Sequence, residues 1–510
     1  MFTEKDLLQI KAKEIDLEKI NSQIDNFKKG FPPAKLQAAA TIGNGLLRFR
    51  DEEVNQMNES YEALMLDKSV LKFVPASGAA SRMFKHLFEF RDAFSPEKET
   101  ELFSAKDFNS IYYFFEHLKN FAFYDDLKEK LNSLGSDIDE LLKNKGYIKI
   151  IDALLNEDGL NYAALPKALL KFHNYFDGSR RSIEEHLVEG AVYGRDHKGN
   201  VKIHFTVSPE HLEKFKLALS NVINKYEACF DVKLNISYSI QKPSTDVLAV
   251  DMDNKPFRDT EGNLVFRPGG HGALIENLNE LNEDIIFVKN IDNIVPDRIR
   301  ETTYIYKKVL ASYLIQLQKQ SFEYLIMLEN EVDSAKLDEV ETFAVEKLMI
   351  SMPEHFESNE ARKNYLFKKL NRPIRTCGMV KNEGEPGGGP FWVMNSQGEI
   401  SLQVVEGSQM DLSLSDQKEI ALKATHFNPV DLVCGVKDYK GHKFDLSQFV
   451  DPKTGFISQK SQNGKKLKAQ ELPGLWNGAM ADWITVFVEC PIITFNPVKI
   501  VNDLLREQHQ

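Results

Sequence analysis

The feature that most constrains the fold is an order of patterns that recurs along the chain: a short strand, a loop of small residues and then a helix. Residues 70–77 (VLKFVPAS) are rich in strand-forming residues, and 77–81 (SGAAS) are all small. In 81–94 (SRMFKHLFEFRDAF), apolar residues recur at helical spacing. The same order returns at 262–281 (GNLVFRPGGHGALIENLNEL). Such an alternation is typical of parallel strands covered by helices.

Further strand patterns occupy 201–207 (VKIHFTV), 233–240 (KLNISYSI) and 284–295 (DIIFVKNIDNIV). Two long stretches, 86–160 and 298–350, show helical spacing instead and interrupt the alternation. We therefore predict an α/β fold, a Rossmann-like sheet with helices on both faces and large helical insertions.

The chain divides by pattern into three parts. We expect 1–66 to be an N-terminal helical segment, broken at 30–34 (GFPPA), where two prolines prevent a continuous helix. Residues 67–400 form the predicted core, and 401–510 a C-terminal part that returns to it. The aromatic run 112–124 (YYFFEHLKNFAFY) is expected to be a packed helix face and not a stacking surface for ligands.

Composition narrows the class of protein. The chain has 510 residues, 42% of them hydrophobic, and a net charge of -12, which disfavours nucleic acid and anionic membranes as partners because both bind basic surfaces. The most apolar segment, 483–495, carries Glu489 and is shorter than the ~20 residues of a membrane span, so we expect a buried strand. No signal-peptide pattern or C-x-x-C pair is present. We expect a reduced, cytoplasmic protein whose oligomeric state stays open.

The loop at 77–81 is the first candidate binding site. Small residues between a strand and a helix let backbone N–H groups approach a ligand, and the N-terminal end of the helix favours an anion such as phosphate. Arg82 follows directly and supplies a fixed positive charge. The loop lacks the G-K-[ST] of a Walker motif and has one of the three glycines of the dinucleotide fingerprint. The alternative is a turn that only packs a helix tightly onto a sheet.

A second segment gives the loop a context. ASGAASRM (76–83) and LPKALLKFHNYFDGSRRSIEEHLVEGAVYG (165–194) together resemble the opening signature of the sugar-nucleotide pyrophosphorylases, which have a GT-A-like nucleotidyltransferase fold. Here the helical stretch 86–160 separates the two halves. The resemblance implies catalytic roles for Arg82 and Lys167. It also implies a nucleotide-binding loop made by Ser77, Gly78, Ala79, Ala80 and Ser81.

Further motifs follow in the order of that family. Gln241 stands where related uridylyltransferases hold the base, and RPGGHG (267–272) resembles their glycine loop near the same base, which implies nucleotide contacts from Gly269, Gly270, His271 and Gly272. His271 is expected to donate a hydrogen bond to a base or phosphate, or alternatively to be a packed ring, and it is not assigned as a catalytic base.

Two further segments carry the phosphate and metal chemistry of the resemblance. FVKNIDNIVPD (287–297) is similar to a strand that ends in a metal-binding aspartate, which implies Asp292 as a ligand of Mg²⁺. The alternative is that Asp292 only caps a turn. ITFNPVKIVNDL (493–504) resembles the element that places a phosphate-binding lysine, here Lys499.

The acceptor side is the least defined. RTCGMVKNEGEPGGGPFWV (375–393) looks like an acceptor loop, and its glycines alternatively form a plain hairpin. The second ligand of a metal is not evident; Asn477 and Asp482 are candidates, and both are alternatively structural. The residues assigned to the sugar phosphate are Asn382, Glu383, Gly387, Gly388 and Asn477.

The implied reaction joins a sugar-1-phosphate to a nucleoside triphosphate, UTP by preference, and releases pyrophosphate. Two alternatives remain open: a catalytically silent protein that binds nucleotide sugars, and a GT-A-type glycosyltransferase. As a whole, the sequence resembles most a bacterial family known as domain of unknown function 4301.

Overall fold

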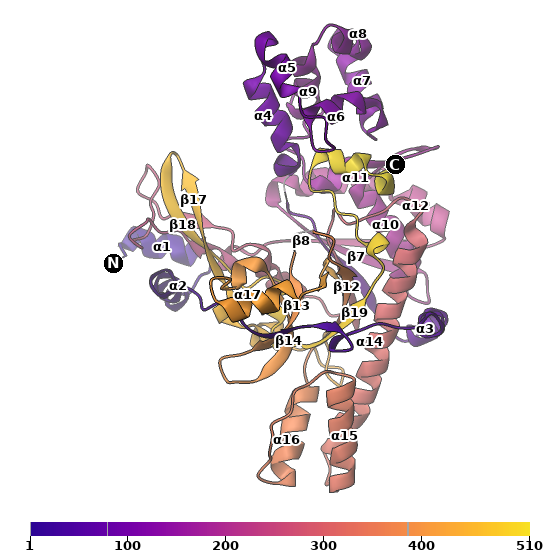
Figure 1. The fold of residues 1–510 in the computed structure, drawn as a ribbon, viewed down its shortest axis with the longest axis vertical. Helices are drawn as coiled ribbons and strands as arrows, with labels where there is room; N and C mark the ends of the chain where they lie inside the picture. The colour runs from indigo at the N-terminus through magenta and orange to yellow at the C-terminus, as the bar shows by residue number, and fades with distance from the viewer. Residues whose placement is uncertain (1, 79, 385–386) are drawn as a thin grey trace. The chain divides into compact units, whose positions relative to one another are not determined.

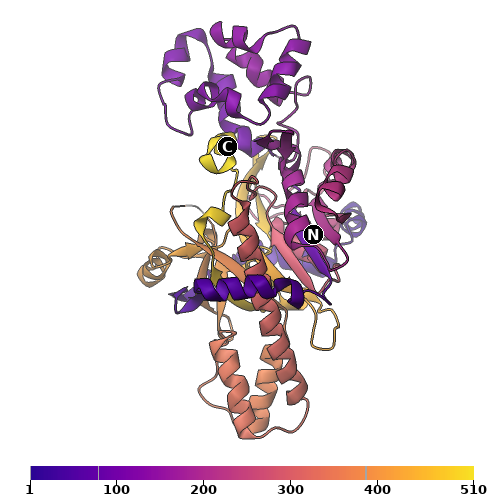
Figure 2. The ribbon, with the colours of Figure 1, turned by 90° about the vertical axis from the view of Figure 1, so that its right-hand side faces the viewer.

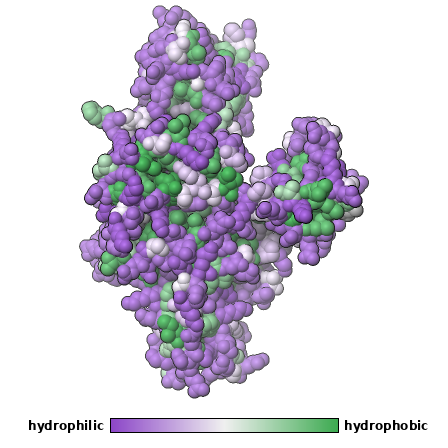
Figure 3. Space-filling view, turned by 180° about the vertical axis from the view of Figure 1, so that it is seen from behind, coloured by the Kyte–Doolittle hydropathy of each residue, from purple (hydrophilic) through white to green (hydrophobic). Residues whose placement is uncertain are grey.

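The computed structural model describes residues 2–78, 80–384 and 387–510. The chain forms two compact units, each assembled from three separate stretches. Unit 1 comprises Met1–Leu71, Ser239–Val288 and Tyr306–Cys490, and unit 2 comprises Lys72–Tyr238, Lys289–Ile305 and Pro491–Gln510. Within the ranges that the structure describes, no helix combines the length and the apolar character needed to cross a membrane. Hydrophilic residues cover most of the face shown in Figure 3.

Unit 2 contains the strand order β4 (Val70–Pro75), β7 (Asn200–Val207) and β8 (Lys233–Ile240), in which β4 and β7 are parallel. These strands confirm the predictions at 201–207 and 233–240. The apolar side chains of β7 pack against three helices, which bury Ile183, Phe215 and Tyr226. These helices are α10 (Ser182–Tyr193), α11 (Leu212–Ser220) and α12 (Ile223–Phe230).

The stretch 86–160 is helical, as predicted, and is drawn in purple in Figure 1. Its aromatic run lies in a hydrophobic cluster with Phe114, Phe121 and Phe123 almost fully buried, so its reading as a packed helix face is confirmed. Val501 and Leu504 from the C-terminal stretch belong to the same cluster. The helices are α4 (Lys85–Ala93), α5 (Glu99–Leu102), α6 (Ile111–Glu116), α7 (Tyr124–Ser133), α8 (Ile138–Lys143) and α9 (Tyr147–Leu155), and the hairpin β5 (Lys171–Tyr175) and β6 (Gly178–Arg181) follows them.

Unit 1 contains the strand order β2-β3-β19-β12-β16-β11. The first four strands are parallel to their neighbours, and β16 is antiparallel to β12. β19 is buried apart from its last residue, which confirms a buried strand within 483–495. The bounds are β2 (Thr41–Ile42), β3 (Gly45–Leu47), β19 (Ile484–Glu489), β12 (Ile374–Lys381), β16 (Asp431–Gly435) and β11 (Ile285–Lys289). The predicted α/β class with a mainly parallel sheet is therefore confirmed.

Smaller sheets and helices complete unit 1. In Figures 1 and 2, α15 and α16 lie side by side, and Arg362 of α16 pairs with Asp338 of α15 at 2.7 Å. The other strands are β1 (Lys35–Ala39), β13 (Gly389–Met394), β14 (Ile400–Val405), β9 (Val247–Leu248), β10 (Phe266–Arg267), β15 (His426–Phe427), β17 (Phe456–Gln462) and β18 (Lys465–Glu471). The helices are α1 (Glu4–Ala12), α2 (Leu17–Lys29), α3 (Asp51–Leu64), α13 (Ile275–Leu278), α14 (Arg300–Leu328), α15 (Ser334–Glu346), α16 (Asn359–Leu370) and α17 (Ser415–Leu422).

Two predictions of secondary structure are wrong in part. The segment 1–66 is not helical throughout, because β1, β2 and β3 occupy Lys35–Leu47. β1 pairs with β13 and β3 pairs with β19, so partners more than 300 residues away in the chain decide the conformation. The strand expected over 284–295 ends at Lys289, and the residues after it are irregular.

The core of unit 2 contains three charged side chains that are almost completely buried. Glu189 on α10 accepts hydrogen bonds from Lys72 Nζ at 2.7 Å and from Lys289 Nζ at 2.6 Å. Tyr193 also donates to Glu189, at 2.9 Å. Burial lowers the pKa of Lys72 to about 8, while the Glu189 charge opposes that shift. One carboxylate therefore compensates two ammonium groups within the core.

This arrangement predicts that Glu189→Gln strongly destabilises the fold, because it leaves two buried ammonium groups without a counter-charge. We expect a loss of about 3–5 kcal/mol in the free energy of unfolding, measured by chemical denaturation. Glu213→Gln on α11, whose side chain is 83% exposed, is the control and should change stability by less than about 0.5 kcal/mol. Equal effects of the two substitutions would contradict the role given to the buried carboxylate.

Candidate functional site

Lys167 is the centre of the candidate site in unit 2. Its ammonium group donates to Asp292 Oδ2 at 2.7 Å and to the backbone carbonyl of Val498 at 2.6 Å. The backbone N–H of Val498 in turn donates to the carbonyl of Asp292 at 3.2 Å. Both charged side chains keep a little under a fifth of their surface exposed. Three of the predicted motifs, far apart in the sequence, therefore meet at one ammonium group.

The small-residue loop approaches the same place. The N–H of Ala80 donates to the carbonyl of Leu165 at 3.1 Å, and the N–H of Lys167 reaches the carbonyl of Gly78 at 3.5 Å. Ser77, Gly78, Ser81 and Arg82 are exposed, and Ala80 is buried; Ala79 lies outside the described residues. The two halves of the split signature are thus adjacent, although the whole helical stretch 86–160 lies between them in the sequence.

Lys499 follows Val498 and is exposed. Its backbone N–H and that of Ile500 both donate to Asp503 Oδ2, at 2.7 and 2.8 Å. This turn fixes the backbone from which the Lys499 side chain extends. The segment therefore brings a second lysine to the neighbourhood of Lys167.

A divalent cation is the cofactor that the resemblance implies for Asp292. Among the residues that the structure describes, no three His, Cys, Asp or Glu side chains gather as a preformed metal site. Mg²⁺ is commonly bound by one or two carboxylates together with water and substrate phosphates. Asp292 fits that role as a single carboxylate, provided that Lys167 turns from it toward a phosphate.

Residues of unit 1 form a second group. His271 and Asn477 line a small cavity of about 110 Å³ together with Glu406, Gln409 and Glu471. Asn477 Nδ2 donates to Gln409 Oε1 at 3.3 Å, and its buried Oδ1 has no hydrogen-bond partner among the residues that the structure describes. Burial lowers the pKa of His271, and the charges of Glu406 and Glu471 oppose that shift. That His271 and Asn477 line the same cavity is not visible in the sequence.

The glycines of the RPGGHG loop have a structural explanation. A Cβ at Gly272 would lie 2.0 Å from the carbonyl oxygen of Pro473, and one at Gly269 would lie 2.7 Å from that of Thr245. Gly270 has a φ of +76°, which side chains rarely adopt. Close packing therefore accounts for these glycines, and their contact with a nucleotide stays a prediction.

The glycines of the predicted acceptor loop also have a structural explanation. A Cβ at Gly387 would lie 2.9 Å from the Phe427 ring, and one at Gly388 would lie 2.6 Å from Val404. Asn382 Oδ1 accepts the N–H of Gly384 at 2.9 Å and so stabilises a turn. The other two predicted contact residues of unit 1 are Glu383, which is exposed, and Gln241, which is half-buried after β8.

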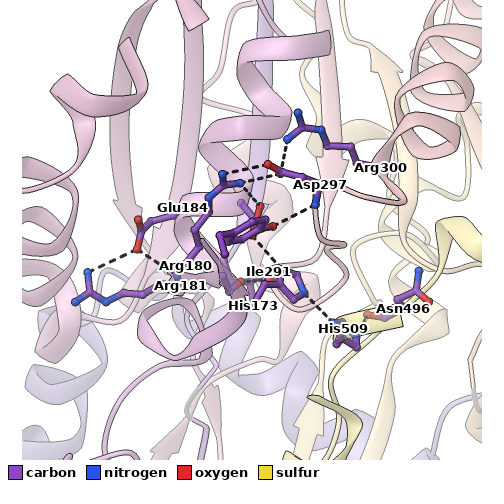
Figure 4. A network of polar contacts seen from close by, with 12 residues as sticks. His173, Arg180, Arg181, Glu184, Ile291, Asp297, Arg300, Asn496 and His509 are labelled. Carbon is purple, nitrogen blue, oxygen red and sulfur yellow. Dashed lines mark hydrogen bonds and ion pairs between the residues drawn. The ribbon is translucent and has the colours of Figure 1, made fainter. Parts of the chain in front are cut away.

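A buried chain of hydrogen bonds in unit 2 was not predicted from the sequence (Figure 4). His173 Nδ1 contacts Glu185 Oε1 at 3.0 Å, and its Nε2 contacts His509 Nδ1 at 2.9 Å. His509 Nε2 faces the backbone carbonyl of Asn496 at 3.1 Å, to which it can only donate. Burial lowers the pKa of each histidine to about 3 and raises that of Glu185 to about 7.

Charged residues surround this chain. Arg180 pairs with Asp297 at 2.8 and 3.1 Å and reaches Glu185 at 3.5 Å. Figure 4 shows Arg300 meeting Asp297 from the other side. His173, Arg180, Glu185 and Asp297 lie within the two quoted segments 165–194 and 287–297, but the sequence does not show that they contact one another.

The network supports the backbone at the candidate site. Asn496, held by His509, donates its N–H to Asn293 Oδ1 at 2.9 Å. In the sequence, Asn293 follows Asp292, and Asn496 is two residues before Val498. The network therefore fixes the two segments that contact Lys167. We regard His509 as a positioning residue.

Comparison with known proteins identifies the family of this chain. A family model described as domain of unknown function DUF4301 matches residues 3–510. The chain belongs to this family. A search among curated proteins finds no similar sequence.

Two solved structures that show some structural similarity to this chain are UDP-sugar pyrophosphorylases. UDP-N-acetylglucosamine pyrophosphorylase from Trypanosoma brucei overlaps with a TM-score of 0.47 at 10% identity, over 99% of this family member and 79% of that chain. UDP-glucose pyrophosphorylase from Leishmania major overlaps with a TM-score of 0.43 at 13% identity, over the same shares. Overlaps of this size establish no activity or substrate for the family member.

Gly78 offers a test of the loop, because a Cβ there meets nothing within 4 Å and no unusual φ requires glycine. We expect Gly78→Ala to leave the free energy of unfolding within about 1 kcal/mol of the wild-type value. We also expect it to weaken binding of a nucleoside triphosphate at least tenfold, measured by calorimetry. Gly407→Ala, equally unhindered, is the control. Unchanged binding to Gly78→Ala would show that the loop does not touch the ligand.

The buried histidines predict a pH dependence of stability. An unfolded histidine has a pKa near 6.5, so below that pH unfolding takes up a proton that the folded His509 does not bind. The free energy of unfolding should therefore fall as the pH is lowered toward about 3. His509→Gln should reduce this slope by about 1.4 kcal/mol per pH unit between about pH 4 and 6, measured by denaturation at several pH values.

The exposed His442 provides the matched control for that experiment. His442→Gln is expected to change the slope less than His509→Gln does, because 76% of the His442 side chain is exposed. Glu185, with its raised pKa, acts in the opposite direction and loses stability as the pH rises through about 7; it is present in both variants. An equal slope for wild type and His509→Gln would contradict the buried, neutral state of His509.

Proposed function

We propose that the protein is a nucleotidyltransferase that joins a sugar-1-phosphate to a nucleoside triphosphate, UTP by preference, and releases pyrophosphate. The observation that carries the proposal is the meeting of Lys167, Asp292 and the Val498–Lys499 backbone beside the loop at 77–82. Each of these segments matches a phosphate- or metal-binding motif of the pyrophosphorylases. If these segments served only for packing, there would be no reason for a lysine, an aspartate and a small-residue loop to lie together with part of their surface exposed.

The chemistry suits these residues. An oxygen of the sugar-1-phosphate attacks the α-phosphorus of the triphosphate, and the bond from that phosphorus to the bridging oxygen breaks, so that pyrophosphate leaves with the electron pair. The nucleophile is already ionised, so no proton is removed. Such a transfer depends on alignment and on positive charge over the phosphates.

Each residue of unit 2 has a role in this proposal. Arg82 forms bidentate hydrogen bonds to phosphate oxygens. Lys167 and Lys499 neutralise charge on the transferred and leaving groups. Asp292 would hold Mg²⁺, which would supply further neutralisation of the phosphates. In the absence of ligands, Asp292 instead keeps the Lys167 ammonium oriented.

The other contacts come from the motif resemblance. Gln241 and the loop of Gly269, Gly270, His271 and Gly272 are proposed to hold the base. The sugar phosphate is proposed to contact Asn382, Glu383, Gly387, Gly388 and Asn477. The partners are therefore a nucleoside triphosphate and a sugar-1-phosphate.

The test is a measurement of pyrophosphate release with Mg²⁺, each common nucleoside triphosphate and a panel of sugar-1-phosphates. We expect release to require one triphosphate and one sugar phosphate. Asp292→Asn and Lys167→Ala should each lower kcat at least about 100-fold, as loss of a charged group at a reacting phosphate does. Omitting Mg²⁺ should abolish release.

A matched ion pair in the same unit controls for charge removal. Lys225 and Asp177 are also 2.7 Å apart but about half exposed, so Asp177→Asn and Lys225→Ala should leave kcat unchanged. Tight triphosphate binding with no release across the panel would replace the proposal by a silent binding protein. Transfer of a sugar from UDP-sugar without pyrophosphate chemistry would replace it by a glycosyltransferase.

A further inference from the structure

The first two turns of α10 carry two polar side chains that have no assigned part in the proposed reaction. Ser182 and His186 are both fully removed from solvent. They are four residues apart in the helix, so they lie on the same face of it. A polar side chain that is buried in this way is normally hydrogen-bonded, so its partner indicates what it does.

Both side chains contact the backbone carbonyl of Ile291. Ser182 Oγ donates a hydrogen bond to this oxygen, and His186 Nε2 lies 3.2 Å from it. Because a carbonyl oxygen can only accept, the proton of the neutral His186 ring is on Nε2 and not on Nδ1. The Nδ1 atom is buried and has no hydrogen-bond partner among the described residues. The hydrogen bond to Ile291 therefore determines the tautomer of this ring.

The Ile291 carbonyl belongs to the peptide group that leads into Asp292. A peptide group is planar, so fixing the direction of this carbonyl also fixes the N–H of Asp292. The carbonyl of Asp292 itself accepts the N–H of Val498 at 3.2 Å. The peptide groups on both sides of Asp292 are therefore hydrogen-bonded, which restricts the direction in which its carboxylate extends from the backbone.

Ser182 also contacts the segment that carries Lys167. The backbone N–H of Ser182 donates to the carbonyl of Leu170 at 3.1 Å, and the N–H of Leu170 donates to the carbonyl of Lys167 at 3.1 Å. Ser182 is thus connected through its backbone to the segment of Lys167 and through its hydroxyl to the segment of Asp292. One residue of α10 therefore links the two halves of this ion pair.

Apolar packing brings the same two segments to α10. Ala168, which follows Lys167, belongs to one hydrophobic cluster with Ile291 and with Ile183 and Leu187 of α10. Apolar burial is not directional, whereas a hydrogen bond requires a defined distance and angle. The packing therefore explains why the segments are close, and the bonds from α10 explain how the peptide group before Asp292 is oriented.

We propose that Ser182 and His186 are positioning residues that orient the Asp292 carboxylate toward Lys167 and the phosphates. This inference rests on the proposed function for the reaction that the orientation serves. The two side chains act through the backbone of Ile291 and touch no substrate. Misplacement of a group at a reacting centre by about 1 Å can lower a rate about 100-fold, so loss of either donor should reduce turnover.

The first test measures pyrophosphate release by variants with and without the donor. Ser182→Ala and His186→Leu remove it, and each should lower kcat at least about tenfold while KM for the triphosphate stays within about twofold, because no group that contacts the substrate is changed. Ser182→Thr and His186→Gln keep a donor at a similar position and should recover most of the lost kcat. Circular dichroism establishes that each variant is folded.

Tyr193→Phe is the matched control. It removes another buried hydroxyl of α10, whose hydrogen bond goes to Glu189 at 2.9 Å. Tyr193 is the last residue of the helix, about 16 Å from Ser182 at 1.5 Å per residue. The substitution therefore takes a buried hydrogen bond from the same helix without changing the contact with Ile291, and kcat should stay within about twofold of the wild-type value.

The second test does not depend on the reaction. The coupling between Lys167 and Asp292 is measured by a double-mutant cycle with Lys167→Met and Asp292→Asn, with chemical denaturation as the readout. The cycle is repeated in the Ser182→Ala, His186→Leu and Tyr193→Phe backgrounds. We expect the coupling to fall below about half of its wild-type value in the first two backgrounds and to be unchanged in the third.

The two tests separate this proposal from the proposed function. Coupling that both Ser182→Ala and His186→Leu leave unchanged overturns the positioning role, whether or not pyrophosphate is released. Reduced coupling in a protein that releases no pyrophosphate supports the positioning role and contradicts the proposed reaction. An equal loss of kcat or coupling in Tyr193→Phe would show only a general effect of weakening α10 and would also overturn the role. If Ser182→Ala does not fold, the comparison of His186→Leu with His186→Gln decides.

Discussion

The ammonium group of Lys167 is the contact on which the arrangement of the candidate site depends. It bonds a carboxylate and a backbone carbonyl that come from segments more than 120 and 330 residues further along the chain. An ammonium group with about a sixth of its side chain exposed needs such partners, because burial removes most of its water. The loop at 77–82 is then held beside it by backbone hydrogen bonds.

Buried polar groups support this contact from within unit 2. The Glu185–His173–His509 chain ends at the carbonyl of Asn496, two residues before Val498. The Lys72–Glu189–Lys289 group lies in the core of the same unit. Such networks cost free energy when partly satisfied, but when satisfied they specify one arrangement of the backbone. Here that arrangement is the one that brings residues 291–293 and 496–499 together.

The glycine-containing loops have different physical origins. In RPGGHG, the absent Cβ atoms make room for the backbone of Pro473 and Thr245. At Gly78, no atom of the residues described lies within 4 Å of the place that a Cβ would fill. The two loops look alike in the sequence, since both place small residues between a strand and a helix. Of the two, only the loop that contains Gly78 leaves open space that a ligand can use.

The sequence by itself determined the alternation of strands and helices, because hydrophobic periodicity is a local property. It also predicted Lys167, Asp292 and Lys499 as site residues from the motifs in which they stand, and that prediction is still to be tested. The tertiary structure decided that residues 35–47 are strands, because their hydrogen-bond partners are β13 and β19. It also decided the His173–His509 contact and the cavity that His271 and Asn477 both line. These features depend on distance and burial between residues far apart in the chain, and no local pattern encodes either quantity.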